Sequence, residues 1–222
     1  MSNKKQTVKT KSSDMFFLAA VAFLLLLVEP MLITLLNASG FALTIIYRTL
    51  CVVIWAFGAM GLIKTAKKEC NLDILKREKP LSPTQWTIIS VATAAIVAYF
   101  IWGKLDIFKV IGSNITSIKT DIAYISMLLL NVSKAGVITI FLAFIQKGLK
   151  KAKWIPLGGI ALGLIWCIMF LLSSVGATFH WTYPVYQFAY GLALGVLFVL
   201  SGNKPRYAFP FIAIATVLIF LS

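Results

Sequence analysis

The sequence predicts an all-α, polytopic membrane protein with about seven transmembrane helices, and three observations lead to this prediction. Apolar side chains make up 60% of the 222 residues, and charged side chains only 13%, about half the share of an ordinary soluble domain. The mean hydropathy is +0.92. The apolar residues gather in runs of roughly 16–25, the length that a helix needs to cross a bilayer. Little sequence remains for a soluble catalytic domain.

The chain divides into a basic tail, residues 1–14, and a single transmembrane domain, residues 15–222. The first apolar run is longer than the core of a signal peptide and carries a charge, so we expect it to stay uncleaved. All runs are interpreted as helices because they are far longer than barrel strands and lack their alternation. The predicted spans are residues 15–37, 41–63, 86–103, 122–145, 155–177, 185–201 and 207–222.

Features inside these spans predict details of their packing. Pro30 removes a hydrogen bond from the first helix and predicts a kink. The fifth and sixth spans each place two glycines four residues apart on one face, which favours close packing within the chain over a dimer seam. The last two spans are short and are expected to tilt or to be covered by neighbours. The glycine pairs are Gly159 with Gly163 and Gly191 with Gly195.

The basic residues predict the orientation. The net charge is +14, and most Lys and Arg lie in the tail and in alternate loops, as the positive-inside rule requires. The N-terminus is therefore expected in the cytoplasm and the C-terminus outside. Because these bases separate apolar runs, we expect them to contact membrane lipids. Nucleic acid is not an expected partner.

Three charges fall inside predicted spans, where they are costly. Glu29 and Arg48 lie at a similar depth on consecutive antiparallel helices, so we predict an intramembrane ion pair between them; a ligand or proton site is the alternative. No Asp or Glu follows Asp121 in the sequence, so Lys134 has no acidic partner on its own span or on any later one. It must reach the interface, meet Glu29, bind an anionic ligand or lie neutral. We place Lys134 at a polar interior site.

Familiar catalytic sets are absent from the sequence. No Asp or Glu occurs from residue 122 onward, and His180 is the one histidine. A zinc site built from several His or carboxylate ligands cannot be assembled, and a Ser-His-Asp triad would need a histidine that lies in a loop. We predict neither a metal nor a cofactor. His180 lies among interfacial aromatic residues and is a candidate contact for a ligand or partner.

Residues 72–222 resemble the CPBP (Abi) family of CAAX prenyl proteases and bacteriocin-processing membrane proteins. Three stretches carry the resemblance: residues 72–77 leading to Gln85-Trp86, residues 146–151 followed by Trp154, and residues 186–195 followed by Ser201-Gly202-Asn203. The catalytic motifs of the family do not carry over. Its Glu-Glu-x-x-x-Arg motif would fall on residues 134–142, which lack Glu and Arg, and Ser174 stands where a histidine should follow Phe170. The last His-x-x-x-Asn would fall near Ala215 and Ile219.

The resemblance therefore implies a degenerate member, a pseudoenzyme that keeps a membrane cavity for binding. The remains of the family site would be lined by Lys134, Ser173 and Ser174. We expect a non-catalytic protein that binds or scaffolds another membrane protein or a peptide, with bacteriocin immunity as one such role. A transport component with a polar intramembrane site is the second hypothesis, and an intramembrane peptidase is the third.

Overall fold

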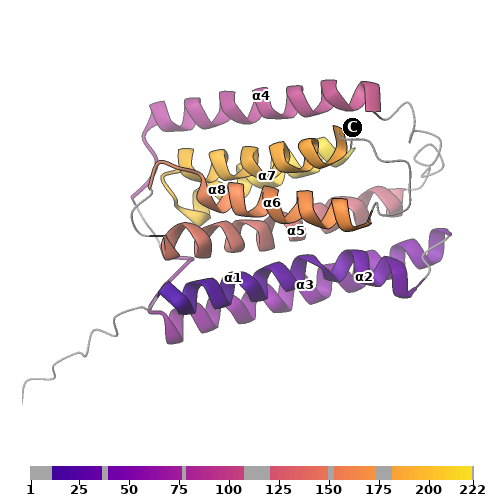
Figure 1. The fold of residues 1–222 in the computed structure, drawn as a ribbon, viewed down its shortest axis with the longest axis horizontal. Helices are drawn as coiled ribbons and strands as arrows, with labels where there is room; N and C mark the ends of the chain where they lie inside the picture. The colour runs from indigo at the N-terminus through magenta and orange to yellow at the C-terminus, as the bar shows by residue number, and fades with distance from the viewer. Residues whose placement is uncertain are drawn as a thin grey trace, which may run out of the picture.

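The computed structural model describes residues 12–36, 40–76, 79–107, 121–149, 153–173 and 182–221. Within these ranges every regular element is a helix, as expected. The helices are α1 (Ser12–Leu26), α2 (Val28–Leu35), α3 (Phe41–Glu69), α4 (Pro83–Ile107), α5 (Asp121–Gly148), α6 (Leu157–Ser173), α7 (Thr182–Leu200) and α8 (Pro205–Leu221). They run side by side as a bundle, with α1 and α2 forming one bent rod (Figure 1). When α1 and α2 are taken as one rod, the helices correspond to the seven predicted spans.

Several helices extend beyond the predicted spans. Among the described residues, five helical segments are long and apolar enough to cross a membrane: 12–35, α3, 83–102, 122–148 and α7; α6 and α8 are shorter. α3 continues past the predicted end at residue 63 because Lys, Ala and Glu are good helix formers. It ends before Asn71, whose φ of 50° turns the chain. α4 begins earlier than expected, because Ser82 and Gln85 form a reciprocal capping box at 3.0 and 3.2 Å.

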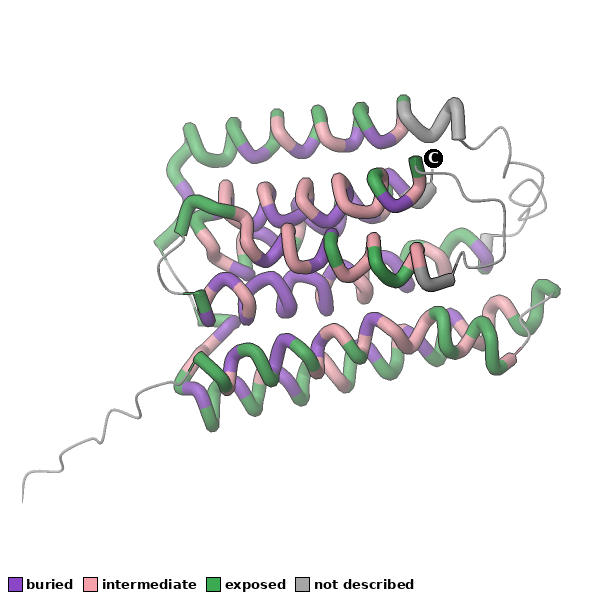
Figure 2. The backbone as a smooth tube through the Cα atoms, viewed as in Figure 1, coloured by how far each residue is buried: buried purple, intermediate pink, exposed green. Residues whose placement is uncertain are grey.

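α5 is the central helix of the bundle. It contacts α1, α3, α6, α7 and α8, and its second half is almost continuously buried (Figure 2). Phe141 and Phe144 are among its largest fully buried side chains. By contrast, apolar residues such as Phe57 on α3 and Tyr99 on α4 are exposed. An apolar surface of this extent is suited to lipid rather than to water.

The bend between α1 and α2 opens the bundle. Pro30 has no N–H to donate to the Leu26 carbonyl, and the helix is interrupted at Leu27, which confirms the predicted kink. The buried Trp55 of α3 donates its indole N–H to the Leu25 carbonyl at 2.5 Å. α1 packs against α5, whereas the backbone of α2 contacts α1 and α3. The second half of the rod therefore diverges from α5.

Replacing Pro30 with Ala is expected to straighten this rod, because the new N–H can bond with the Leu26 carbonyl. Spin labels at Phe17 and Leu35, both exposed, would report a longer distance in Pro30→Ala. Met31→Ala is the matched control, since Met31 is also exposed and changes no backbone donor. An unchanged distance in Pro30→Ala would mean that packing of Trp55, rather than the proline, imposes the bend.

α6 and α7 pack at their backbones, as the glycine spacing predicted for contacts within the chain. A Cβ added to Gly159 would lie 2.6 Å from the Gly195 Cα, and one added to Gly163 would lie 2.5 Å from the Phe188 carbonyl oxygen. Only hydrogen fits at these positions. The two helices therefore form one rigid unit, on which the aromatic residues of the site are mounted.

Candidate functional site

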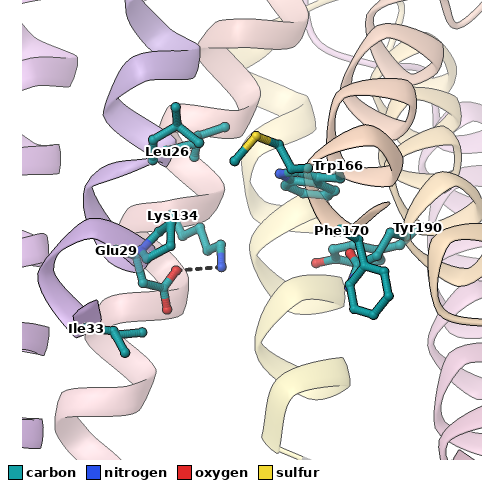
Figure 3. A pocket seen from close by; sticks show the side chains of 11 residues that line it. Leu26, Glu29, Ile33, Lys134, Trp166, Phe170 and Tyr190 are labelled. Carbon is teal, nitrogen blue, oxygen red and sulfur yellow. Dashed lines mark hydrogen bonds and ion pairs between the residues drawn. The ribbon is translucent and has the colours of Figure 1, made fainter. Parts of the chain in front are cut away.

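The candidate site is a cavity of about 390 Å³ between the bend of the first rod and the helices α5, α6 and α7. Figure 3 shows Glu29 and Lys134 on one side of it, and Trp166, Phe170 and Tyr190 on the other. The described residues that line it are Leu26, Leu27, Glu29, Pro30, Ile33, Lys134, Trp166, Met169, Phe170, Gln187 and Tyr190. One wall is charged, and the facing wall is aromatic.

An ion pair forms the charged wall. Lys134 Nζ on α5 lies 2.7 Å from Glu29 Oε2 on α2, and the two side chains are 17% and 18% exposed. This pair spans the gap that the bend opens between α2 and α5. In a low-dielectric environment each charge would be costly alone, so the pair stabilises both. Of the options that the sequence left open for Lys134, the structure selects the contact with Glu29.

The predicted Glu29–Arg48 pair is wrong. Arg48 is 7% exposed, and its Nη1 donates to the Ala123 carbonyl at 3.2 Å and to Ser126 Oγ at 3.3 Å, both on α5. The two residues lie on neighbouring helices, as expected, but they bind different parts of α5. Depth along a helix could be estimated from the sequence, whereas the rotation of each helix about its axis could not.

The aromatic wall comes from α6 and α7. The rings of Trp166 and Tyr190 stack with centroids 5.5 Å apart and an interplanar angle of 10°. The Tyr190 hydroxyl donates to Thr216 Oγ1 on α8 at 3.1 Å, which fixes this ring. Phe170 stacks on Tyr183 at 5.4 Å. The wall is thus largely aromatic, and Gln187 also lines the cavity.

This aromatic wall was not foreseen from the sequence, although its spacing gives a signal. Trp166 and Phe170 are four residues apart, and Tyr183, Gln187 and Tyr190 follow at intervals of four and three. Such intervals place side chains on one helix face. In an apolar span this pattern does not distinguish a cavity wall from ordinary core packing.

The remaining predicted site residues are Ser173, Ser174 and His180. Ser173 is the last residue of α6. Ser174 and His180 lie outside the described residues. The two predictions for Ser174 and His180 therefore stay predictions. Within the described ranges, no group of three or more His, Cys, Asp or Glu side chains could hold a metal ion.

The bundle has one strongly basic end. In the antiparallel arrangement, the end of α3, the start of α4, the end of α5, the start of α6 and the α7–α8 turn meet there (Figure 1). Lys67 Nζ lies 2.8 Å from Asp73 Oδ2, and this hydrogen bond holds the pKa of the Asp73 carboxyl below its usual value. The other described bases of this end are Lys64, Lys68, Lys76, Lys79, Lys147, Lys153, Lys204 and Arg206.

Fold and cavity together define an α-helical bundle of the membrane type with a polar site inside its apolar interior. No family model matches the sequence, and neither a curated protein nor a solved structure shows significant similarity to it.

Proposed function

We propose that the protein is a non-catalytic binding protein of the membrane, whose cavity holds part of a partner membrane protein or peptide. The observation that supports this proposal is the charged pair facing an aromatic wall across about 390 Å³. An apolar side chain can fill the space against Trp166 and Phe170. A polar or dipolar end, such as a peptide unit, can contact Glu29 and Lys134 without a net charge having to be buried.

The groups that line the cavity argue for binding rather than catalysis. Its carboxylate already has a partner, because the ammonium group of Lys134 donates a hydrogen bond to Glu29 Oε2 at 2.7 Å. A general base needs a reachable proton, and a nucleophile needs an activating base beside it. The sequence offers no Asp or Glu from residue 122 onward. A CPBP-like pseudoenzyme fits this chemistry, and bacteriocin immunity is one form that partner binding can take.

A transport component is the second candidate, and the interrupted helix favours it. Membrane transporters place substrate and ion sites at broken helices, where backbone carbonyls become available. Here Pro30 cannot donate to the Leu26 carbonyl, and both residues line the cavity beside Glu29. The same architecture would serve a small polar substrate that enters between α2 and α6.

We also propose an orientation and a location. The basic end would face the bacterial cytoplasm, because Lys and Arg are retained on that side during insertion. The rod formed by α1 and α2 begins at this end, and α8 finishes at the opposite one (Figure 1). The cavity would then lie toward the outer half of a cell membrane, since Glu29 is about 9 Å from the outer end of α2 at 1.5 Å per residue.

Site-specific photo-crosslinking tests the binding proposal. A photoreactive residue is placed at Met169, which lines the cavity, and in a matched variant at Ile168, which is exposed on the same helix. We expect one defined adduct at Met169 in native membranes and only heterogeneous lipid adducts at Ile168. Intact mass after mild purification identifies the adduct.

The adduct also separates the candidate functions. A protein or peptide at Met169 supports the partner-binding proposal, whereas a small polar molecule supports transport. In either case Lys134→Met should reduce the adduct, because it removes half of the charged wall. Identical adducts at Met169 and Ile168 would mean that the cavity has no specific occupant. That result would contradict both the partner-binding and the transport proposals.

A further inference from the structure

A second cavity, of about 490 Å³, lies at the basic end of the bundle. Lys147, one of its lining residues, is about 20 Å along α5 from Lys134, at 1.5 Å per residue, so the two cavities are separate. The described residues that form this second cavity come from the end of α5, from residue 153 before α6 and from the α7–α8 turn. Its lining residues are Gln146, Lys147, Lys153, Gly202 and Asn203.

The electrostatics of this cavity favour an anion. Among the described residues that line it, two are lysines and none is acidic. α6 begins at Leu157 and α8 at Pro205, so the positive ends of two helix dipoles lie nearby. Gln146 holds this geometry, because its amide donates to the Ile155 carbonyl at 2.9 Å and accepts from the Gly158 N–H at 3.4 Å.

Asn203 adds an acceptor that a phosphate cannot satisfy. Its Nδ2 donates to the Lys153 carbonyl at 2.9 Å. Its Oδ1 is buried and accepts no hydrogen bond from the described residues. Buried polar atoms normally have partners. Phosphodiester oxygens carry no hydrogen and cannot donate to Oδ1, whereas a hydroxyl on the same headgroup can.

We propose that this cavity binds the headgroup of an anionic phospholipid that carries a hydroxyl group, such as phosphatidylglycerol. Lys147 and Lys153 contact the phosphodiester, and Asn203 Oδ1 accepts from the headgroup hydroxyl. Exposed apolar residues border the site, namely Leu149, Trp154 and Ile155. They offer a surface for acyl chains, which favours a lipid over a soluble phosphodiester with the same headgroup. Basic cavities between membrane helices suit such headgroups.

Native mass spectrometry of the full chain in mild detergent tests this proposal. The probes are phosphatidylglycerol, phosphatidylcholine and phosphatidylmethanol, an anionic phosphodiester without a headgroup hydroxyl. We expect the wild type to retain phosphatidylglycerol most strongly, phosphatidylmethanol less strongly and phosphatidylcholine least. Lys147→Gln/Lys153→Gln should weaken retention of phosphatidylglycerol by about tenfold or more. Lys68→Gln, whose side chain is 85% exposed at the same end, should change it less than about twofold.

The variant Asn203→Gly tests separately the contact between Asn203 Oδ1 and the headgroup hydroxyl. Glycine tolerates the φ of 59° at this position and removes the acceptor. The preference for phosphatidylglycerol over phosphatidylmethanol should vanish, while the preference of both over phosphatidylcholine persists. If the variants fail to fold, the order of retention in the wild type remains decisive.

Three results would overturn the proposal. Equal retention of phosphatidylglycerol and phosphatidylcholine would show that the cavity does not select anionic lipids. An equal loss in Lys68→Gln would mean that general surface charge, rather than the cavity, attracts the lipid. Displacement of the lipid by an equal concentration of soluble glycerophosphoglycerol would assign the cavity to a free phosphodiester instead of a membrane lipid.

Discussion

Gly163→Ala is expected to lower the free energy of unfolding by about 1–3 kcal/mol, the usual cost of overpacking a tight interface. The new Cβ would lie 2.5 Å from the Phe188 carbonyl oxygen, and a backbone atom cannot move aside as a flexible side chain can. α6 and α7 must therefore separate. Thermal unfolding of the purified protein in detergent measures the loss.

Gly61→Ala is the matched control for this prediction. Gly61 lies on α3, where an added Cβ meets nothing within 4 Å, so alanine should be neutral or slightly stabilising. Separation of α6 and α7 should also disturb the Trp166–Tyr190 stack, and with it any adduct at Met169. Equal stabilities of Gly163→Ala and the wild type would contradict the close packing described above.

Glu29→Gln and Lys134→Met are each expected to destabilise the protein by about 3–5 kcal/mol, because each leaves an uncompensated charge in an apolar interior. The double variant should recover most of this loss, since neither charge then remains. The coupling energy from the four unfolding free energies measures the pair. Side-chain exposures of only 17% and 18% set this pair apart from surface ion pairs, which contribute little.

Lys68→Gln controls for loss of a basic residue in general, and its exposed side chain should make it nearly neutral. If the losses of Glu29→Gln and Lys134→Met simply add in the double variant, the two charges do not depend on each other. The result also bears on function. A stable double variant that loses its adduct at Met169 would assign the charged wall to binding as well as to stability.

The helical bundle could be predicted from the sequence because bilayer-length apolar runs leave few alternatives. The kink in the first helix could also be predicted, because the missing N–H of Pro30 removes a hydrogen bond within that helix whatever the neighbouring helices are. Close helix packing within the chain was indicated by the glycine spacing, because a missing side chain has a purely steric effect, but the sequence did not show that α6 and α7 would pack on each other. Each of these predictions depends on neighbours in sequence or on a single steric rule.

The partners of the intramembrane charges could not be assigned in this way. Glu29 has bases on two other helices at comparable depth, and the choice between Arg48 and Lys134 depends on helix rotation. Arg48 satisfies its Nη1 with a carbonyl and a hydroxyl of α5, groups that almost every helix contains. The aromatic wall was missed for a related reason, since Trp166 and Tyr190 are also ordinary components of an apolar core.

The position of α4 has a consequence for how the chain is assembled. α4 packs on α7 and α8 and on no other described helix, and Trp86 meets Tyr207 and Phe211 through its ring. A chain released from the ribosome in order exposes α4 long before either partner is made. α4 must therefore remain in lipid, alone or held by another protein, until synthesis is almost complete. The last two helices thus complete the bundle. In a chain truncated before α7, α4 would lack both of the helices on which it packs.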